Sequence, residues 1–344
     1  MTTVFSFAPA YEHDFTGHPE HAGRGQSVLR VLEAKQALDG VTNLVPTLAT
    51  ASQIRRSHTQ AVIDRVQALS LRGGGRIDAD TYVTESSYDL ALLGAGAVTN
   101  SALEIAKGNA RNGYVFVRPP GHHAEYERSM GFCLFNNVAV AVKEIQASTK
   151  HQRIMVIDID VHHGNGTQDI FYDDDSVLFI STHQYSSFFY PGTGSAREIG
   201  KDKGITFNLN VPLAAGVGDL GYSAIFDDVI SLAARKFMPD MILISAGFDA
   251  HWQDPLAAME LSLTGYAQLT QKLIALADQL CDGRILFVQE GGYMLDILAH
   301  AVLNTLYALK GTDQISDPAG LSRASEFPSV NQMISELQLL HLLM

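Results

Sequence analysis

The chain has few cysteines, few basic residues relative to acidic ones and no long apolar run, and each shortage excludes a class of protein. Only Cys133 and Cys281 occur, and neither belongs to a CxxC pair, so a disulfide framework or a thiolate zinc site is not expected. The 24 Lys and Arg residues against 37 Asp and Glu residues give a net charge of -13, which argues against nucleic-acid or anionic-membrane partners. No stretch approaches about eighteen apolar residues and no basic leader is present, which predicts a cytoplasmic protein. Because GxSxG is also missing, a serine-nucleophile elbow is excluded.

Length and hydropathy patterning predict one large α/β domain. The 344 residues are 46% hydrophobic, which is enough apolar material for a sizeable core. Apolar β-branched runs alternate with segments of helical periodicity, and no Pro- or Ser-rich linker separates them. This predicts a mostly parallel central sheet with helices on both faces, a single domain over residues 1–344, and a helical tail at about 325–344. Strands are expected near residues 4–7, 114–117, 154–159, 177–181, 205–210, 241–245 and 285–289, and helices near 27–38, 52–71, 88–107, 133–147, 166–171, 221–237, 264–281 and 294–309.

The stretch at residues 154–166, IMVIDIDVHHGNG, is the most informative in the chain. Its first half is typical of a buried strand, and Asp158, Asp160 and His162 then alternate at period two, so they share one face. A carboxylate and an imidazole at this spacing can bind one divalent cation, and mixed nitrogen and oxygen ligands suit zinc and also iron or cobalt. The alternative is a strand end whose polar residues only hydrogen-bond neighbouring loops.

Polar side chains also follow three other predicted strands. His122 and His123 come after the strand at 114–117, Asp249 after 241–245 and Tyr293 after 285–289. Because ligands bind beyond the carboxyl ends of parallel strands, these residues are expected at one edge of the sheet. Asp249 could instead be a helix cap, and Tyr293 a packed aromatic after a turn. The two prolines before the histidine pair fix a rigid turn that presents both imidazoles locally.

Six motifs together resemble the zinc-dependent histone deacetylase family, which shares the arginase/deacetylase fold and includes bacterial acetylpolyamine amidohydrolases. In chain order they are RPPGHH at 118–123, GFCLFNN at 131–137, DIDVHHGNGTQ at 158–168, YPGTG at 190–194, SAGFD at 245–249 and EGGY at 290–293. Asn165 resembles the class II branch, where class I members carry Asp. The likeness covers residues 5–310 and is that of a class II-like bacterial histone deacetylase-like amidohydrolase.

The resemblance implies one Zn²⁺ per chain, bound by Asp160, His162 and Asp249, with coordination left for water and the substrate carbonyl. It implies that Tyr293 donates its phenolic hydrogen to the oxygen that becomes negative in the tetrahedral intermediate. These residue types meet the needs of amide hydrolysis, because zinc can lower the pKa of bound water from 15.7 to about 7 and no covalent nucleophile is then required.

The resemblance also assigns roles to the histidine pair. His123 would act as the general base and then as the acid for the leaving amine, and His122 would be its electrostatic partner. Asp158 would orient His122 through a carboxylate–imidazole hydrogen bond. Asn165 would do the weaker equivalent for His123, leaving that imidazole less basic than a carboxylate would.

The resemblance further implies a narrow slot for an extended aliphatic chain, and structural K⁺ or Na⁺ ions. Leu256 stands where some polyamine-selective relatives carry Glu, which favours acyl-lysine over acetylpolyamine substrates. The implied substrate-binding residues are Gly131, Phe132, Tyr190, Leu256 and Gly291. The implied monovalent-cation ligands are Asp158, Asp160, His162, Ser181 and Thr182 for an inner site, and Phe171, Asp174, Val177 and Phe207 for an outer one.

Two loops depart from the family pattern or leave it open. The first loop reads HPEH at 18–21, so His21 replaces the family's Arg near an internal channel, with Arg24 as a candidate substitute. This leaves the acetate exit route open. Asp78 and Asp80 are candidates for binding substrate backbone or amine, although a solvated loop is the simpler interpretation.

The favoured hypothesis is a zinc amidohydrolase that removes acetyl or related acyl groups from lysine side chains or similar amines. Its partners would be an acetylated lysine peptide or protein, or an acetylated small amine or polyamine, with a homo-oligomer left open. An acetylpolyamine amidohydrolase is the first alternative. A binuclear manganese ureohydrolase would need further bridging carboxylates and has no use for Tyr293, and a non-catalytic acyl-lysine binding module is expected to have lost Tyr293 or a metal ligand.

Overall fold

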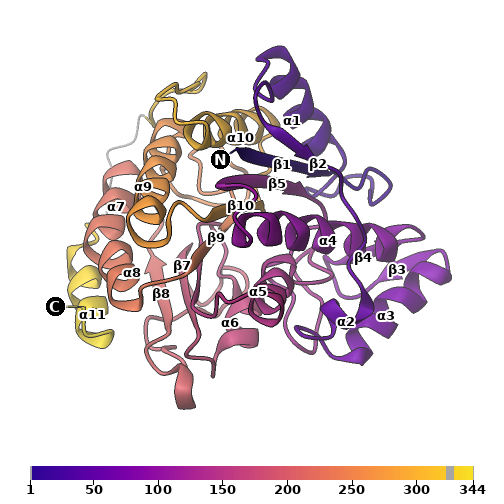
Figure 1. Cartoon of the computed structure of the whole chain (residues 1–344), viewed down its shortest axis with the longest axis horizontal. Coiled ribbons are helices and arrows are strands. Elements are labelled where there is room, and N and C mark those ends of the chain that lie inside the picture. The colour runs from indigo at the N-terminus through magenta and orange to yellow at the C-terminus, as the bar shows by residue number, and fades with distance from the viewer. Residues whose placement is uncertain (1, 323–328, 344) are drawn as a thin grey trace.

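A parallel sheet of eight strands forms the centre of the computed structural model, which describes residues 2–322 and 329–343 (Figure 1). Its strand order is β2–β1–β5–β10–β9–β6–β7–β8. A separate antiparallel hairpin pairs β3 (Gly74–Arg76) with β4 (Tyr82–Thr84). The predicted α/β class with a mostly parallel sheet is confirmed. The strands of the main sheet are β1 (Thr3–Ala8), β2 (Thr42–Leu44), β5 (Asn112–Val117), β6 (Ile154–Asp158), β7 (Val177–Gln184), β8 (Asn208–Leu213), β9 (Met241–Ala246) and β10 (Ile285–Gln289).

Helices cover both faces of this sheet, because strand side chains alternate between two apolar clusters. Met155 and Ile157 of β6 pack toward α1, α7, α8, α9, α10 and α11, whereas Ile154 and Val156 pack toward α4, α5 and α6. Helices α2 and α3 pack beside α4 and α5 at the periphery. The helices are α1 (Gly23–Ala34), α2 (Ala51–Ile54), α3 (Gln60–Leu71), α4 (Ser87–Ala106), α5 (Asn137–Ser148), α6 (Asn165–Phe171), α7 (Asp219–Ile225), α8 (Ser231–Phe237), α9 (Leu263–Cys281), α10 (Leu295–Leu309) and α11 (Asn331–Leu340).

Local signals explain most element boundaries and also the places where the expected boundaries were wrong. The helix expected from residue 133 begins at 137, because the Asn136 side chain accepts a hydrogen bond from the Ala139 N–H and caps it there. The strand expected at 205–210 runs from 208 to 213, because Thr206 has a φ of 73° that is incompatible with a strand. The helix expected at 221–237 contains a π-helical turn at Phe226–Ile230 between α7 and α8.

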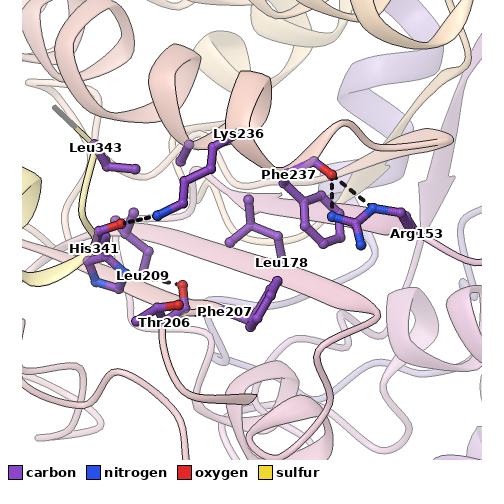
Figure 2. Close-up of a pocket in the computed structure, with 10 residues that line it drawn as sticks. Arg153, Leu178, Thr206, Phe207, Leu209, Lys236, Phe237, His341 and Leu343 are labelled. Atoms are coloured by element: carbon purple, nitrogen blue, oxygen red, sulfur yellow. Dashed lines mark hydrogen bonds between the residues drawn. The ribbon is translucent and has the colours of Figure 1, made fainter. Parts of the chain in front are cut away.

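The C-terminal helix α11 folds back onto the π-helical turn at Phe226–Ile230 and the β8 edge of the sheet (Figure 1). Figure 2 shows the cavity beside the end of this helix, with Lys236 bonded to His341. Lys236 at the end of α8 donates hydrogen bonds from Nζ to the carbonyl oxygens of His341 (2.9 Å) and Leu342 (3.1 Å). These bonds satisfy carbonyls left free at the helix end. A cavity of about 110 Å³ remains beneath this contact, and Leu343 and Phe207 line it. Residues 325–328 and 344 of the expected tail lie outside the described residues.

Two further expectations concern cysteine and membranes. Cys133 and Cys281 are both buried and free. Among the helices of the described residues, none has the length and hydrophobicity needed to cross a membrane.

Candidate active site

Four neighbouring strands at the centre of the sheet carry the predicted site residues. The order β5–β10–β9–β6 places the ends of these strands side by side. The loop after β5 carries His122 and His123, and the segment after β6 carries Asp160 and His162. Residues after β9 and β10 supply Asp249 and the turn at 290–293. The long-range pairing of strands therefore brings together residues that lie up to 171 positions apart in the sequence, from His122 to Tyr293.

Asp160, His162 and Asp249 meet as a buried cluster of possible metal ligands. Each offers one ligand atom, and these atoms lie within 4.8 Å of one another. Nδ1 of His162 is 3.1 Å from Oδ1 of Asp160 and 3.2 Å from Oδ2 of Asp249. Zinc bonds of about 2.1 Å in tetrahedral geometry would place such donors about 3.4 Å apart. The three residues therefore have nearly the spacing that one cation requires.

The surroundings of this cluster also fit a cation. Oδ2 of Asp249 is buried and has no hydrogen-bond partner among the described residues, although Oδ1 accepts from the Val161 N–H at 2.8 Å. A buried carboxylate oxygen left in this way is costly unless a cation binds it. A Cβ at Gly291 would overlap Oδ2 of both Asp249 and Asp160, so only glycine fits there, and its N–H donates to Asp160 Oδ2 at 2.7 Å.

The histidine pair lies beside this cluster, and each imidazole is oriented through Nδ1. His122 Nδ1 is 3.0 Å from Asp158 Oδ2, and His123 Nδ1 is 2.7 Å from Asn165 Oδ1. The two ring centroids are 3.9 Å apart. Both rings are at least 95% buried, so these side chains have fixed positions. Nε2 of His122 lies 3.8 Å from Asp160 Oδ1, and no hydrogen bond among the described residues occupies Nε2 of His123.

Burial and nearby charges shift the pKa values of His122 and His123 in opposite directions. Burial by itself lowers the pKa of His122, but the carboxylates of Asp160 and Asp158 outweigh it and hold that pKa well above its usual range. Burial, followed by the charge of His122, lowers the pKa of His123 well below its usual range. Burial lowers the pKa of His162, but the neighbouring carboxylates of Asp160 and Asp249 outweigh burial and raise that pKa to about 10. Of the pair, His122 is therefore favoured as the cation and His123 as the neutral base.

The Tyr293 turn is held from beneath by a buried arginine. Arg24 donates from Nε to the Gly292 carbonyl at 2.9 Å and from Nη2 to the Glu290 carbonyl at 2.5 Å, and its guanidinium lies over the Tyr293 ring. The N–H of Tyr293 donates to Asp254 at 2.8 Å. Burial raises the pKa of Tyr293 well above its usual value, so the phenol stays protonated and able to donate. Arg24 therefore lies against the turn at 290–293, and its role as a substitute for the family's arginine stays a prediction.

A cavity of about 280 Å³ opens onto the cluster and brings together four of the five residues predicted to bind substrate: Gly131, Phe132, Tyr190 and Leu256. His123, His162 and Tyr293 also line it. Phe132 has a φ of 68°, an uncommon left-handed conformation for a residue with a side chain, and its ring meets Tyr293 edge-on at 6.0 Å. Gly291 lies instead behind the ligand carboxylates.

The residues predicted for monovalent cations fall into two groups. Asp158 pairs in register with Ser181, and Thr182 donates to the Asp158 carbonyl at 3.3 Å, so part of the inner group is together. In the outer group, Asp174 forms an ion pair with Lys143 at 2.8 Å, and the Lys143 ammonium lies over the Phe171 ring. Both cation sites stay predictions.

Several residues beside the site were not predicted to have a role there. Phe189 stacks on His162 with centroids 5.1 Å apart, and its position beside Tyr190 could have suggested it. Glu290 is buried, and its Oε2 accepts from the N–H groups of Gly121 and His122. Burial raises the pKa of Glu290 to about 7. Glu125 contacts Asn165 across a loop, and nothing in the sequence spacing indicates this contact.

Comparison with known proteins identifies the class that this fold and site define. Residues 18–309 match the histone deacetylase domain. The crystal structure of the HDA15 HD domain is similar over 99% of this chain and 96% of that chain, with a TM-score of 0.91 and 35% sequence identity. The fold is therefore the arginase/deacetylase fold.

Relatives with similar sequences in other organisms belong to the same class. A probable deacetylase of Archaeoglobus fulgidus is 38% identical over 299 residues, covering 86% of this chain and 82% of the relative. A histone deacetylase-like amidohydrolase of Pseudomonas aeruginosa is 37% identical over 308 residues, covering 87% and 80%. The chain belongs to the histone deacetylase family, and this membership makes it a hydrolase of the deacetylase type.

Proposed function

We propose that this chain is a zinc-dependent deacetylase that removes acetyl or related acyl groups from lysine side chains or similar amines. The observation that supports this best is the buried Asp249 Oδ2, which accepts no hydrogen bond among the described residues and lies 3.2 Å from Nδ1 of His162, a residue that lines the cavity. Asp160, His162 and Asp249 would hold the ion. When bound, Zn²⁺ would supply a Lewis acid that lowers the pKa of a water molecule from 15.7 to about 7.

The side chains beside this cluster suit the proton transfers of amide hydrolysis. His123, with Nδ1 bonded to Asn165, has Nε2 free to take a proton from the attacking water. The same nitrogen then gives that proton to the leaving amine as the C–N bond breaks. His122, bonded to Asp158, contributes charge beside it rather than the proton. Tyr293 donates its phenolic hydrogen to the carbonyl oxygen as negative charge develops there.

The cavity favours a substrate with a slender aliphatic stem. Phe132, Phe189, Tyr190 and Leu256 give it apolar walls that suit four methylene groups ending in an amide. Asp80 also lines the cavity, and its carboxylate could pair with an ammonium group. This contact supports acetylated polyamines or other acetylated amines as the alternative substrate class, whereas Leu256 favours acetyl-lysine.

Other classes on this fold have less support. A binuclear manganese ureohydrolase needs a larger set of bridging carboxylates, and the described residues form one cluster, made of Asp160, His162 and Asp249. A non-catalytic acyl-lysine binding module would need neither Tyr293 nor the imidazole of His123 at the cavity, and both residues line it. K⁺ or Na⁺ ions at the inner and outer groups remain part of the proposal and would have structural roles.

The decisive experiment is an activity panel with matched metal states. The protein, stripped of metal and then loaded with Zn²⁺, is assayed with acetyl-lysine peptides, acetylated polyamines and acetylated small amines. We expect turnover of at least one class, loss of turnover on stripping, and recovery with one equivalent of Zn²⁺. A protein that binds Zn²⁺ but turns over no substrate, or that works equally well without metal, would refute the proposal.

A further inference from the structure

Asn165 joins His123 to a second acidic residue, Glu125, through its side-chain amide. Oδ1 of Asn165 is 2.7 Å from His123 Nδ1, and Nδ2 donates to Glu125 Oε1 at 2.7 Å. The other Nδ2 hydrogen faces the Met130 sulfur at 3.4 Å. Asn165 is 5% exposed and the Glu125 side chain 31% exposed, so the three residues run from the site toward solvent.

This arrangement determines where the protons lie. An ionised carboxylate can only accept hydrogen bonds, so the NH₂ group of Asn165 must face Glu125 and its oxygen must face His123. The oxygen can only accept, so His123 Nδ1 must carry a hydrogen. Nε2 is then the unprotonated nitrogen of the neutral ring, as a general base toward the cavity requires. Without Glu125 the amide could turn over and favour the wrong tautomer.

We propose that Glu125 is a positioning residue that fixes the Asn165 amide and, through it, the active tautomer of His123. This inference rests on the proposed deacetylase function for its kinetic consequences, but the hydrogen-bond geometry that carries it does not depend on that function. Glu125 touches neither the cavity nor the candidate metal ligands among the described contacts, so its action passes through Asn165.

The backbone around Glu125 is held independently of its carboxylate. Its N–H donates to the Arg128 carbonyl at 2.8 Å, and its carbonyl oxygen is bonded to His58 Nδ1 at 2.9 Å. The Arg128 guanidinium is 4.0 Å from the carboxylate, too far for a hydrogen bond. Shortening the side chain therefore removes the bond to Asn165 and leaves the loop anchored.

The hydrogen bond between Asn165 and Glu125 means that the residue type tolerated at one position depends on the residue at the other. The substitution Asn165→Asp would place a second carboxylate against Glu125, in a site that is mostly buried, and like charges at this distance repel. The amide of Asn165 avoids this repulsion and still accepts from His123. The substitution should therefore be tolerated only after the charge of Glu125 has been removed.

The test uses E125A, E125Q, N165D and the double variant E125Q/N165D, with E127A as the matched control. Glu127 is exposed on the same loop, two residues along. We expect E125A to lower kcat about tenfold, with KM and zinc content within twofold of wild type. E125Q, which keeps an acceptor for the Asn165 amide, should recover most of the rate, and E127A should resemble wild type. N165D should be impaired and should regain activity when E125Q is added.

Nitrogen NMR of the histidine rings gives a readout that does not need activity. Wild type should show His123 protonated at Nδ1, and E125A should shift it toward the Nε2–H tautomer. Wild-type kcat in E125A, an equal loss in E127A, or strictly additive effects of E125Q and N165D would overturn the inference. If no substrate is turned over at all, the deacetylase proposal fails. The NMR spectra then decide the Glu125 inference, and an unchanged His123 tautomer in E125A refutes it.

Discussion

Glu20 is a buried anion between two arginines, and removing its charge should make the fold measurably less stable in a pH-dependent way. Glu20, Arg24 and Arg118 are all fully buried. Arg24 Nη1 donates to Glu20 Oε1 at 3.1 Å, and Arg118 bonds both carboxylate oxygens, with Nη2 at 2.9 Å from Oε2. The change to test is Glu20→Gln, which keeps the shape and leaves two guanidinium groups without their counter-charge.

The expected magnitude follows from the pKa of this carboxyl group. Burial alone would raise it, but Arg118 and then Arg24 outweigh burial and lower the pKa of Glu20 from 4.5 to about 2. At about 1.4 kcal/mol per unit, this difference corresponds to about 3 kcal/mol of unfolding free energy at pH 7. Because the folded-state pKa is the lower one, the stabilisation is complete well above pH 4.5 and is lost as the pH falls toward 2. About 1 kcal/mol of it should remain at pH 3.

The assay is urea denaturation of wild type and Glu20→Gln at pH 7 and pH 3. We expect the variant to be about 3 kcal/mol less stable at pH 7, with the difference shrinking by about 2 kcal/mol at pH 3. Asp296→Asn is the matched control, because it removes an exposed partner of Arg30 and should cost less than about 1 kcal/mol. A difference between wild type and Glu20→Gln that is the same at both pH values would refute the reasoning.

Tyr293, Gly291 and Lys236 each allow a test of one further contact. Tyr293→Phe should keep its zinc content and lower kcat by about 10²–10³-fold, because one donor to the developing oxyanion is lost, and unchanged steady-state turnover would count against that role. Gly291→Ala should weaken zinc binding at least about tenfold in a chelator competition, because the new methyl group displaces two ligand carboxylates. If Gly291→Ala bound zinc as tightly as wild type, the Asp160 and Asp249 carboxylates would not lie against residue 291 as described. Lys236→Met should lower the unfolding free energy by about 1–3 kcal/mol in urea with activity retained, because two bonds to the end of α11 are lost, and an unchanged midpoint would contradict this contact.

Local pattern was sufficient to predict the elements that present the site. Alternation of β-branched runs with helical periodicity indicated a parallel sheet, and polar residues after Val117 and Asp158 indicated the edge where ligands bind. The boundaries that were wrong have particular causes. Thr206 interrupts a strand through its own backbone conformation, and Asn136 starts a helix later than apolar spacing suggests. Each effect comes from a single residue, which the periodicity of apolar residues does not reveal.

Period-two alternation and rigid proline turns are local properties of the chain, so the residue types at the strand ends could be predicted without a structure. The adjacency of β5, β10, β9 and β6, which places Asp249 beside His162, became known from the folded chain. The folded chain also shows that Gly291 supports the ligand carboxylates, and that Glu125 meets Asn165. Such contacts arise from strand order and loop packing between residues far apart in the chain, and no spacing along the sequence encodes them.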